Sequence, residues 1–183
     1  MKLELEKMLY SNKKIDAVYE VDTACGGFAT VVKRSDGTEE LYPNCKVETV
    51  LDVLAAKCGK SLSRLRLMRE QKSGKKHAHV DFYELDLQLI LMPVRHRKAV
   101  NSNHGAMAYL NVSRVVSVAG AKTATITFIS GETLQVKESA DSVRGKLNSG
   151  KQLLLTTCFA YSEKLHHMRI TLRRLQKLAG AGL

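Results

Sequence analysis

The sequence predicts an α+β fold: one antiparallel, β-rich domain with a mid-chain helix and a basic amphipathic helix at its C-terminal end. Three observations support this prediction. Short β-branched stretches separated by turn residues fill much of the chain, apolar residues repeat at helical spacing near residue 50, and they do so again after residue 162. We divide the chain into an arm of residues 1–14, a β-rich domain of residues 15–150 and a helical segment of residues 151–183.

The composition is that of a folded chain. Of the 183 residues, 44% are hydrophobic and 26% are charged, as in globular rather than disordered proteins. No apolar run approaches the roughly 18 residues of a membrane span, and the first residues lack the apolar core of a signal peptide. We therefore expect a cytoplasmic protein that does not enter a membrane.

The first strands are marked by alternation and by a turn. Residues 15–22 alternate apolar and polar side chains, as a half-buried strand does. Residues 28–32 are rich in β-branched residues and form the second strand, and residues 38–42 form the third. Ser35-Asp36-Gly37 makes the hairpin turn between them, because Asp-Gly adopts a positive φ at low cost.

A helix is expected after the break at Pro43, with Asn44 as its N-cap and Gly59 as its stop. Its apolar face repeats at i, i+3, i+4, i+7 and i+11, at Val47, Val50, Leu51, Leu54 and Cys58. Residues 60–76 then carry a loop signal at Ser73-Gly74 and the single acid Glu70. Seven cations share this segment: Lys60, Arg64, Arg66, Arg69, Lys72, Lys75 and Lys76. It is either a solvated, mobile connection or a surface that contacts nucleic acid.

Residues 80–92 read as one or two strands, and the last of them are apolar on both faces, which indicates a central strand. Pro93 ends this strand, because proline cannot donate to a ladder. A basic loop, residues 94–105, follows and is held between Pro93 and Gly105. Further strands are expected at residues 108–118, 123–129 and 133–136, with a hairpin turn between the last two.

Two helices close the chain. Ser139 caps a short helix that has Asp141 near its positive end and finishes at residues 148–150. Residues 152–161 are apolar without a clear period and stay open between helix and strand. Ser162 caps a long final helix with a heptad-like apolar stripe at Leu165, Met168, Leu172, Leu175 and Ala179. We expect this stripe to dock on the domain's own core, with a dimer seam as the alternative.

The net charge of +11 is concentrated in the second half of the chain. Residues 1–90 carry 15 Lys and Arg against 14 Asp and Glu, a net charge of +1, whereas residues 91–183 carry 14 against 4, a net charge of +10. Such asymmetry favours a polyanionic partner, most often nucleic acid. The alternative interpretation is a basic protein whose charge only keeps it soluble.

Motifs of catalysis and of cofactor or metal binding are absent from the sequence. It contains no P-loop, G-x-G-x-x-G, G-x-S-x-G or H-E-x-x-H motif. Cys158 has apolar neighbours that suggest an inert, buried thiol, and the four cysteines are expected to be reduced core residues. The histidines lack companion ligands at zinc spacing. We expect no enzyme, no cofactor and no metal site.

The order of several weak motifs resembles the ComK family of bacterial competence transcription factors. The motifs are the runs at residues 58–62 and 76–80, the strand ending Leu91-Met92-Pro93, the run at residues 108–112 and the stretch from Ile126 to Ser139. The similarity extends from about residue 15 to about residue 148. Residues 110–143 also resemble, locally, small flagellar-operon proteins of the FlbD type.

The resemblance implies an oligomeric activator of competence genes for natural transformation that binds paired A/T-rich boxes of double-stranded DNA through the minor groove. A proteolytic adaptor is a further partner that the family suggests. Because an A-tract minor groove is narrow and strongly negative, an inserted arginine gains most there. Arg95 and Arg97 are the first choice for insertion, on a loop that also carries Lys98. Asn101 or Asn103 would bond acceptors on the groove floor.

The remaining candidate residues are phosphate contacts, which set the register on DNA without reading its sequence. They are Arg64, Arg66, Arg69, Lys75, Lys76, Arg169, Arg173 and Arg174. The alternative function is an RNA- or ribosome-associated basic protein, although no exposed aromatic stacking pair is evident from the sequence. A third is a scaffold that binds only protein through the stripe of residues 165–179.

Overall fold

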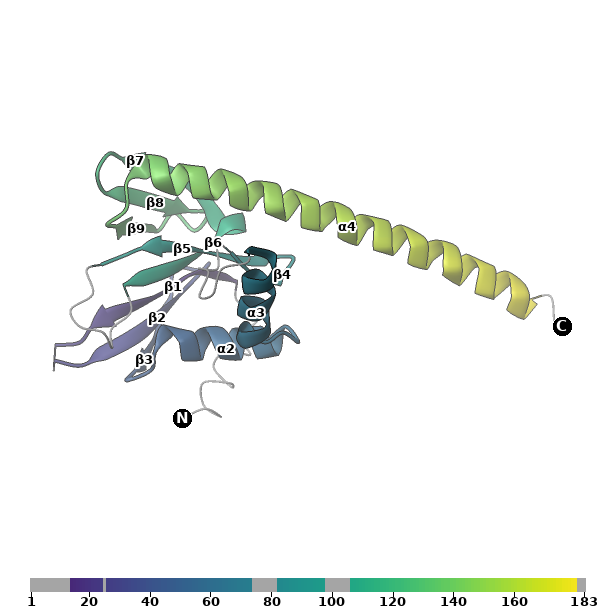
Figure 1. Cartoon of the computed structure of the whole chain (residues 1–183), viewed down its shortest axis with the longest axis horizontal. Helices are drawn as coiled ribbons and strands as arrows, with labels where there is room; N and C mark the ends of the chain where they lie inside the picture. The colour runs from purple at the N-terminus through teal and green to yellow at the C-terminus, as the bar shows by residue number, and fades with distance from the viewer. Residues whose placement is uncertain (1–13, 25, 74–81, 98–105, 181–183) are drawn as a thin grey trace.

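The structure is a computed structural model that describes residues 14–24, 26–73, 82–97 and 106–180. It has two antiparallel β-sheets and, within the described residues, three α-helices labelled α2, α3 and α4. Figure 1 shows the sheets stacked in layers, with one very long helix projecting from them. The predicted α+β class is therefore confirmed. Nearly all of the predicted arm of residues 1–14 lies outside the described residues.

The larger sheet has six strands in the order β3-β2-β1-β6-β5-β4. Neighbouring strands are antiparallel, and the central pair β1–β6 joins two three-stranded halves. The bounds are β1 Ile15–Asp22, β2 Phe28–Arg34, β3 Glu39–Pro43, β4 Tyr83–Asp86, β5 Leu89–Arg95 and β6 Met107–Asn111. The strands predicted from residues 15–42 and their hairpin turn are confirmed, but the half-burial expected of β1 is wrong, because every residue from Ile15 to Glu20 is buried.

The smaller sheet, β7-β8-β9, is formed by the next hairpins, β7 Val115–Gly120, β8 Ala124–Phe128 and β9 Thr133–Val136. The single strand predicted at residues 108–118 is wrong, because a 3-10 turn, η1 Val112–Arg114, divides it between the two sheets. Asn111 stabilises the break. Its side-chain amide donates to the carbonyls of Ile15 at 2.9 Å and Gln88 at 3.0 Å, and its Oδ1 accepts the N–H of Ser113 at 3.2 Å.

Helices α2 Val47–Lys57 and α3 Leu62–Ser73 follow the first half of the sheet. Val47, Val50, Leu51 and Leu54 of the predicted apolar face of α2 are buried, Cys58 is half-buried at the C-cap, and Gly59 ends the helix at φ +67°. Asn44 is not its N-cap: Lys46 occupies that position and makes no side-chain cap bond. Of the two alternatives for residues 60–76, the mobile connection is wrong for Leu62–Ser73, since Leu62 is buried and Leu65 packs against the same core, which holds this part as a helix. Residues 74–76 lie outside the described residues.

Helix α4 is continuous from Ala140 to Gly180. Ser139 caps it as predicted, because its Oγ accepts the N–H of Ser142 at 3.3 Å. The expected stop at residues 148–150 and the expected new start at Ser162 are both wrong. Ser and Gly inside a helix cost only about 0.5–1 kcal/mol each, which a helix already nucleated at Ser139 tolerates. The undecided residues 152–161 are helical.

The larger sheet separates two apolar cores. One core lies on the α2–α3 face and contains Val18 and Leu91, and the other lies between the sheet, the smaller sheet and the start of α4 and contains Ala17 and Met92. Alternate residues of the same strands therefore face different cores. This confirms that the stretch apolar on both faces belongs to a strand covered on both sides.

Pro93 does not end its strand, contrary to the prediction, because β5 continues to Arg95. The N–H of His96 points towards β6, where it donates to Ala106 O at 2.8 Å, whereas the N–H of Arg95 points the other way, to Glu138. Pro93 is two residues from Arg95, so its nitrogen faces away from β6. Its missing N–H therefore removes no bond from the β5–β6 ladder.

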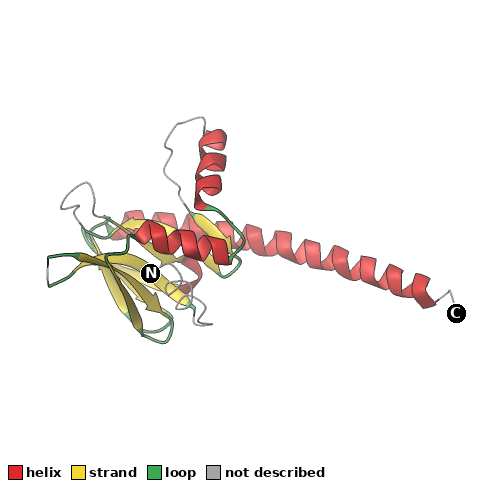
Figure 2. Cartoon of the chain, turned by 90° about the horizontal axis from the view of Figure 1, so that it is seen from below, coloured by secondary structure: helices red, strands yellow, loops and turns green. Residues whose placement is uncertain are grey.

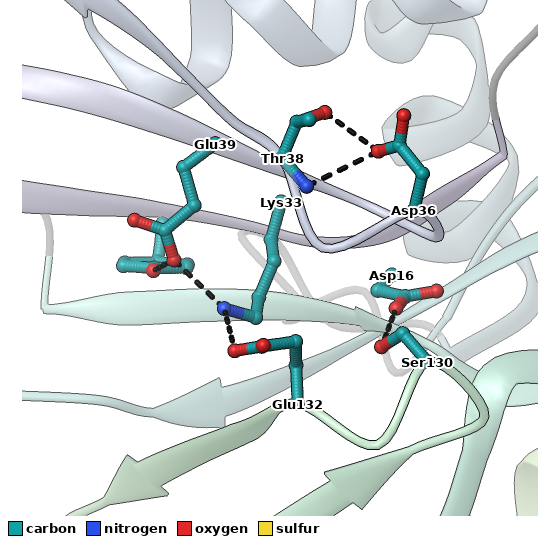
Figure 3. A network of polar contacts seen from close by, with 8 residues as sticks. Asp16, Lys33, Asp36, Thr38, Glu39, Ser130 and Glu132 are labelled. Carbon is teal, nitrogen blue, oxygen red and sulfur yellow. Dashed lines mark hydrogen bonds and ion pairs between the residues drawn. The ribbon is translucent and has the colours of Figure 1, made fainter.

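Two buried charged groups join the layers (Figure 3). Lys33 on β2 donates to Glu39 at 2.8 Å and to Glu132, between β8 and β9, at 3.2 Å. Burial lowers the pKa of Lys33, but the bonds to these carboxylates outweigh it, so the pKa is raised and the ammonium stays charged. The fully buried Asp16 on β1 accepts bonds from Arg114 at 2.9 Å and Ser130 at 2.8 Å.

Candidate nucleic-acid interface

Arg95, the first predicted groove residue, is exposed at the end of β5. Its backbone is held on the side away from β6: its N–H donates to Glu138 Oε2 at 3.0 Å, and its carbonyl accepts the N–H of Lys137 at 2.9 Å. Lys146 of α4 donates to the carbonyl of Pro93 at 3.2 Å. A rigid backbone thus carries an exposed guanidinium.

Arg97, the second predicted groove residue, is bound by carboxylates of β1. Its Nη1 donates to Asp22 Oδ1 at 2.5 Å, and its Nη2 donates to Glu20, whose side chain is buried. The side chain of Arg97 is only 13% exposed. Insertion of Arg97 into a groove stays a prediction. Arg97 would first have to break its ion pair with Glu20, which costs free energy because the Glu20 carboxylate would stay buried without that cation.

His96 lies between these arginines and contributes to the rigidity of the strand end. Its ring packs against Tyr19 at a centroid distance of 5.0 Å, and its Nδ1 lies 3.2 Å from Gln135 O. Burial lowers the pKa of His96, so the ring is neutral at pH 7. No sequence pattern predicts this packing, since Tyr19 and Gln135 are distant from His96 in the chain.

Several predicted site residues cannot be placed. Lys75, Lys76, Lys98, Asn101 and Asn103 lie outside the described residues. Arg69 lies on α3, and only its backbone is described.

Helix α3 carries Arg64 and Arg66, both exposed. Arg66 is tied to the edge of the sheet, because its Nε donates to the hydroxyl of Tyr83 on β4 at 3.5 Å. Lys60, just before the helix, donates to the carbonyl of Glu84 on the same strand. Helix α3 thus presents its cations beside β4, and Figure 2 shows it standing off the body at a steep angle to α4.

The outer half of α4, residues 155–180, carries a further group of exposed cations. Arg169, Arg173 and Arg174 are exposed there as predicted. Lys164, which lies over the Tyr161 ring at 5.9 Å, adds a fourth exposed cation. Glu163 is the only acid of this half. The helix also places His166 and His167 among the cations, a grouping that sequence reasoning passed over.

The described candidates form three separate groups rather than one patch. Arg95 lies four residues along β5 from Leu91, the partner of Tyr83 on β4, which is about 13 Å. Arg169 lies about 45 Å along α4 from its first residue, and that first turn is the part of α4 near Arg95. A rod-like polyanion long enough to span them could contact two groups at once, whereas a small anion could contact only one.

Within residues 14–24, 26–73, 82–97 and 106–180, no group of three or more His, Cys, Asp or Glu side chains is arranged to hold a metal ion. None of the described helices combines the length and the apolar character that a membrane crossing requires. Cys158 is exposed, so its expected burial is wrong, whereas Cys45 is buried as expected and Cys58 is half-buried. Comparison of the chain with protein families, curated proteins and solved structures finds no match.

Proposed function

We propose that this protein is a cytoplasmic, nucleoid-associated transcription activator that binds double-stranded DNA. The observation that supports it best is the outer half of α4, where four exposed cations face solvent and one acid accompanies them. Like charges so close repel one another unless a polyanion neutralises them. A phosphate backbone supplies this neutralisation along a line, which suits a helix that projects from the body (Figure 1).

Phosphate contacts by the exposed arginines would dominate the affinity. Arg169, Arg173 and Arg174 on α4 and Arg64 and Arg66 on α3 are the described candidates. If all five reach phosphates, the logarithm of the association constant falls against the logarithm of salt concentration with a slope of about −4.5. These contacts fix the register of the protein on the duplex and carry no base preference.

Base preference is assigned to Arg95. Its backbone is held between Glu138, Lys137 and the β5–β6 ladder, so ordering it on DNA costs little entropy. Insertion of its guanidinium into a narrow minor groove gives a preference for A/T-rich duplex. This agrees with what the ComK resemblance implies and supports activation at A/T-rich promoters.

The phosphate-contact role is tested by fluorescence anisotropy with a 30-base-pair duplex over a range of salt concentrations. The triple variant R169A/R173A/R174A should reduce the salt slope by about three and weaken binding to every sequence. A matched control, K14A/K46A/K122A, removes three exposed charges from the body and should change the slope little. Equal slopes for the two triple variants would show that α4 does not contact the backbone.

The groove role is tested by comparing A/T-rich with G/C-rich duplexes. Arg95→Ala should lose most of the preference for A/T-rich DNA, because the arginine gains more in the narrow groove than elsewhere. Lys137→Ala, which removes an exposed cation beside the same strand end, should weaken binding and keep the preference. Full A/T selectivity in the Arg95 variant would refute the assignment.

A second candidate is an RNA- or ribosome-associated protein. The exposed aromatic side chains of α4, Phe159 at 70% and Tyr161 at 48%, favour it, because bases of RNA stack on such rings. However, residues two positions apart in a helix point about 200° away from each other around the axis. The rings of Phe159 and Tyr161 therefore do not form one stacking platform. Competition with structured RNA separates the candidates: displacement of duplex DNA at equal RNA concentration would favour RNA.

A further inference from the structure

The outer half of α4 exposes an apolar stripe that the body does not cover. Its members are Tyr161, Leu165, Met168, Leu172 and Leu175, which are 48–61% exposed. The last α4 residues that pack on the core are Leu153 and Leu154. The stripe therefore does not dock on the domain's own core, and that prediction is wrong for its described members. Figure 1 shows this part of α4 clear of both sheets.

The stripe has the spacing of a coiled-coil seam. Its residues follow one another at intervals of four and three, so Leu165 and Leu172 take heptad position a, and Tyr161, Met168 and Leu175 take position d. Charged residues adjoin the stripe directly, with Arg169 at position e and Lys164 at position g. Between Tyr161 and Leu175 the exposed large apolar side chains are limited to positions a and d. Such a face is the narrow seam of a helix pair, whereas a membrane-surface helix needs a broader one.

Both flanks of the seam are cationic. Arg169 is followed around the helix by His166 and Arg173, and on the other side Lys164 is followed by His167 and Arg174. Glu163 falls at position f, on the side opposite the seam. Because residues at e and g set the choice of coiled-coil partner, these flanks select for negative charge.

A second copy of this chain does not supply that charge. In a parallel pair, Lys164 at position g faces Arg169 at position e of the other copy, and in an antiparallel pair e faces e and g faces g. The remaining e and g positions between residues 157 and 176 are uncharged, namely Thr157, Ser162, Thr171 and Gln176. No register of a homodimer therefore gives an opposite-charge pair across the seam. The like-charge pairs that do form destabilise the homodimer.

We propose that residues 158–175 bind an amphipathic helix of a different protein, with apolar residues at its a and d positions and Asp or Glu at its e and g positions. The apolar seam provides the contact area, and Lys164 and Arg169 select the acidic flanks. The proposal shares Lys164 and Arg169 with the cations proposed to face DNA, but it rests on the exposure of the stripe together with its charged flanks, and its peptide test needs no DNA.

The test uses the full chain and two synthetic 28-residue helical peptides. Both have Leu at every a and d position; one has Glu at every e and g position and the other has Lys. Isothermal titration calorimetry should show that the Glu peptide binds about tenfold or more tighter than the Lys peptide, with the difference shrinking at high salt. Equal binding of the two peptides would overturn the charge selection.

Variants locate the binding on the seam. Leu172→Asn should reduce affinity for the Glu peptide about tenfold or more, whereas Phe159→Asn removes an even more exposed apolar residue at position b and should have little effect. The double variant K164E/R169E should reverse the preference and bind the Lys peptide. Circular dichroism confirms that each variant keeps its helix. If Leu172→Asn and Phe159→Asn weaken binding equally, the seam is not the binding surface.

Sedimentation equilibrium of the chain alone tests the competing occupant. The proposal expects a monomer at micromolar concentration, or an oligomer that Leu172→Asn leaves intact. A dimer that Leu172→Asn dissociates would show that a second copy occupies the stripe, and this would overturn the proposal. Binding to vesicles of anionic lipid that is lost in Leu172→Asn, together with no binding of either peptide, would overturn it too.

Discussion

The inner and outer halves of α4 have similar apolar patterns and opposite surroundings. In the inner half, residues 140–154, Val143 is 0% exposed and Leu147 is 5% exposed, because the smaller sheet and η1 lie against them. In the outer half, Leu165, Met168 and Leu172 repeat the spacing of three and four residues seen at Ala140, Val143 and Leu147, and they are 54%, 61% and 55% exposed. The comparison teaches that periodicity shows which residues share a face but does not show what covers that face.

The outer half stays helical because the inner half begins the helix for it. Starting a helix is costly, whereas each residue added to an existing one makes a further backbone bond. The inner half is held on the body by its buried apolar side chains, and the burial of each contributes about 1.5–3 kcal/mol to the stability of the fold. The outer half makes no such contribution to the stability of the body, which leaves its seam available for a partner.

The largest expected difference between the halves is in the effect of removing a leucine. Leu147→Ala should lower the free energy of unfolding by about 2–4 kcal/mol, because it leaves a cavity in the core. Leu172→Ala removes the same atoms from an exposed site and should change it by less than about 0.5 kcal/mol. Urea denaturation measures both. Equal losses would mean that the outer half is packed against the body.

The boundary between the halves can be tested at Gly150. A Cβ at this position would lie 2.8 Å from Phe82 Cε1 and 2.8 Å from Val112 Cγ2. Gly150→Ala should therefore destabilise the protein by about 1–3 kcal/mol through overpacking.

Gly145, in the same half, is the matched control, because a Cβ there would meet nothing within 4 Å. Gly145→Ala should stabilise the helix by about 0.5–1 kcal/mol. Thermal unfolding of the two variants should thus shift in opposite directions. A shift in the same direction would show that the close approach at Gly150 is not maintained.

The start of the inner half is fastened by Glu138, whose effect depends on pH. Its carboxylate accepts bonds from Lys146 at 2.7 Å, Ser142 at 2.5 Å and the N–H of Arg95 at 3.0 Å. Burial raises the pKa of Glu138, but these bonds outweigh it, so the pKa is below the ordinary 4.5. The stabilisation is present above pH 4.5 and is lost as the pH falls through the lowered pKa.

Glu138→Gln should therefore lower the free energy of unfolding by about 1 kcal/mol at pH 7. The difference from the unaltered protein should shrink as the pH falls below about 4.5, where the unaltered carboxyl also becomes neutral. Urea denaturation at a series of pH values measures this. A difference that is constant from pH 7 to pH 3 would mean that the charge of Glu138 does not matter.

The smallest expected effect is at Ser162, inside the outer half. Because α4 is continuous there, Ser162→Ala should raise local helix stability by about 0.5 kcal/mol. If a helix instead began at Ser162, the same change would remove its cap and cost about 1 kcal/mol. Amide hydrogen exchange of residues 160–175 distinguishes the two, with slower exchange expected in the variant.

Prediction from sequence succeeded where the signal was local. The alternation of residues 15–22, the Asp36-Gly37 turn and the stop at Gly59 each depend on neighbouring residues, and the structure confirms all three. It failed where contacts between residues distant in the chain determine the local structure. The break after Asn111 needs the carbonyls of Ile15 and Gln88, and α3 needs the core that receives Leu62.

The candidate site shows the same division. The cations themselves, including those of α4, were evident from charge counting alone. The pairing of Arg97 with Glu20 was not, because the two residues are 77 positions apart and meet only when the two halves of the larger sheet are joined. The same residue type is therefore exposed at Arg95 and engaged at Arg97.

The sequence by itself determined the fold class, the faces of most helices and strands, and the cationic character of the second half. These depend on side-chain spacing and on composition, which are properties of short segments. Only the tertiary structure decided which faces are covered, because the sheets reach as far as Leu154 and no farther along α4. Between Tyr161 and Leu175 the helix keeps its apolar pattern, but these side chains are exposed to solvent rather than covered by the body.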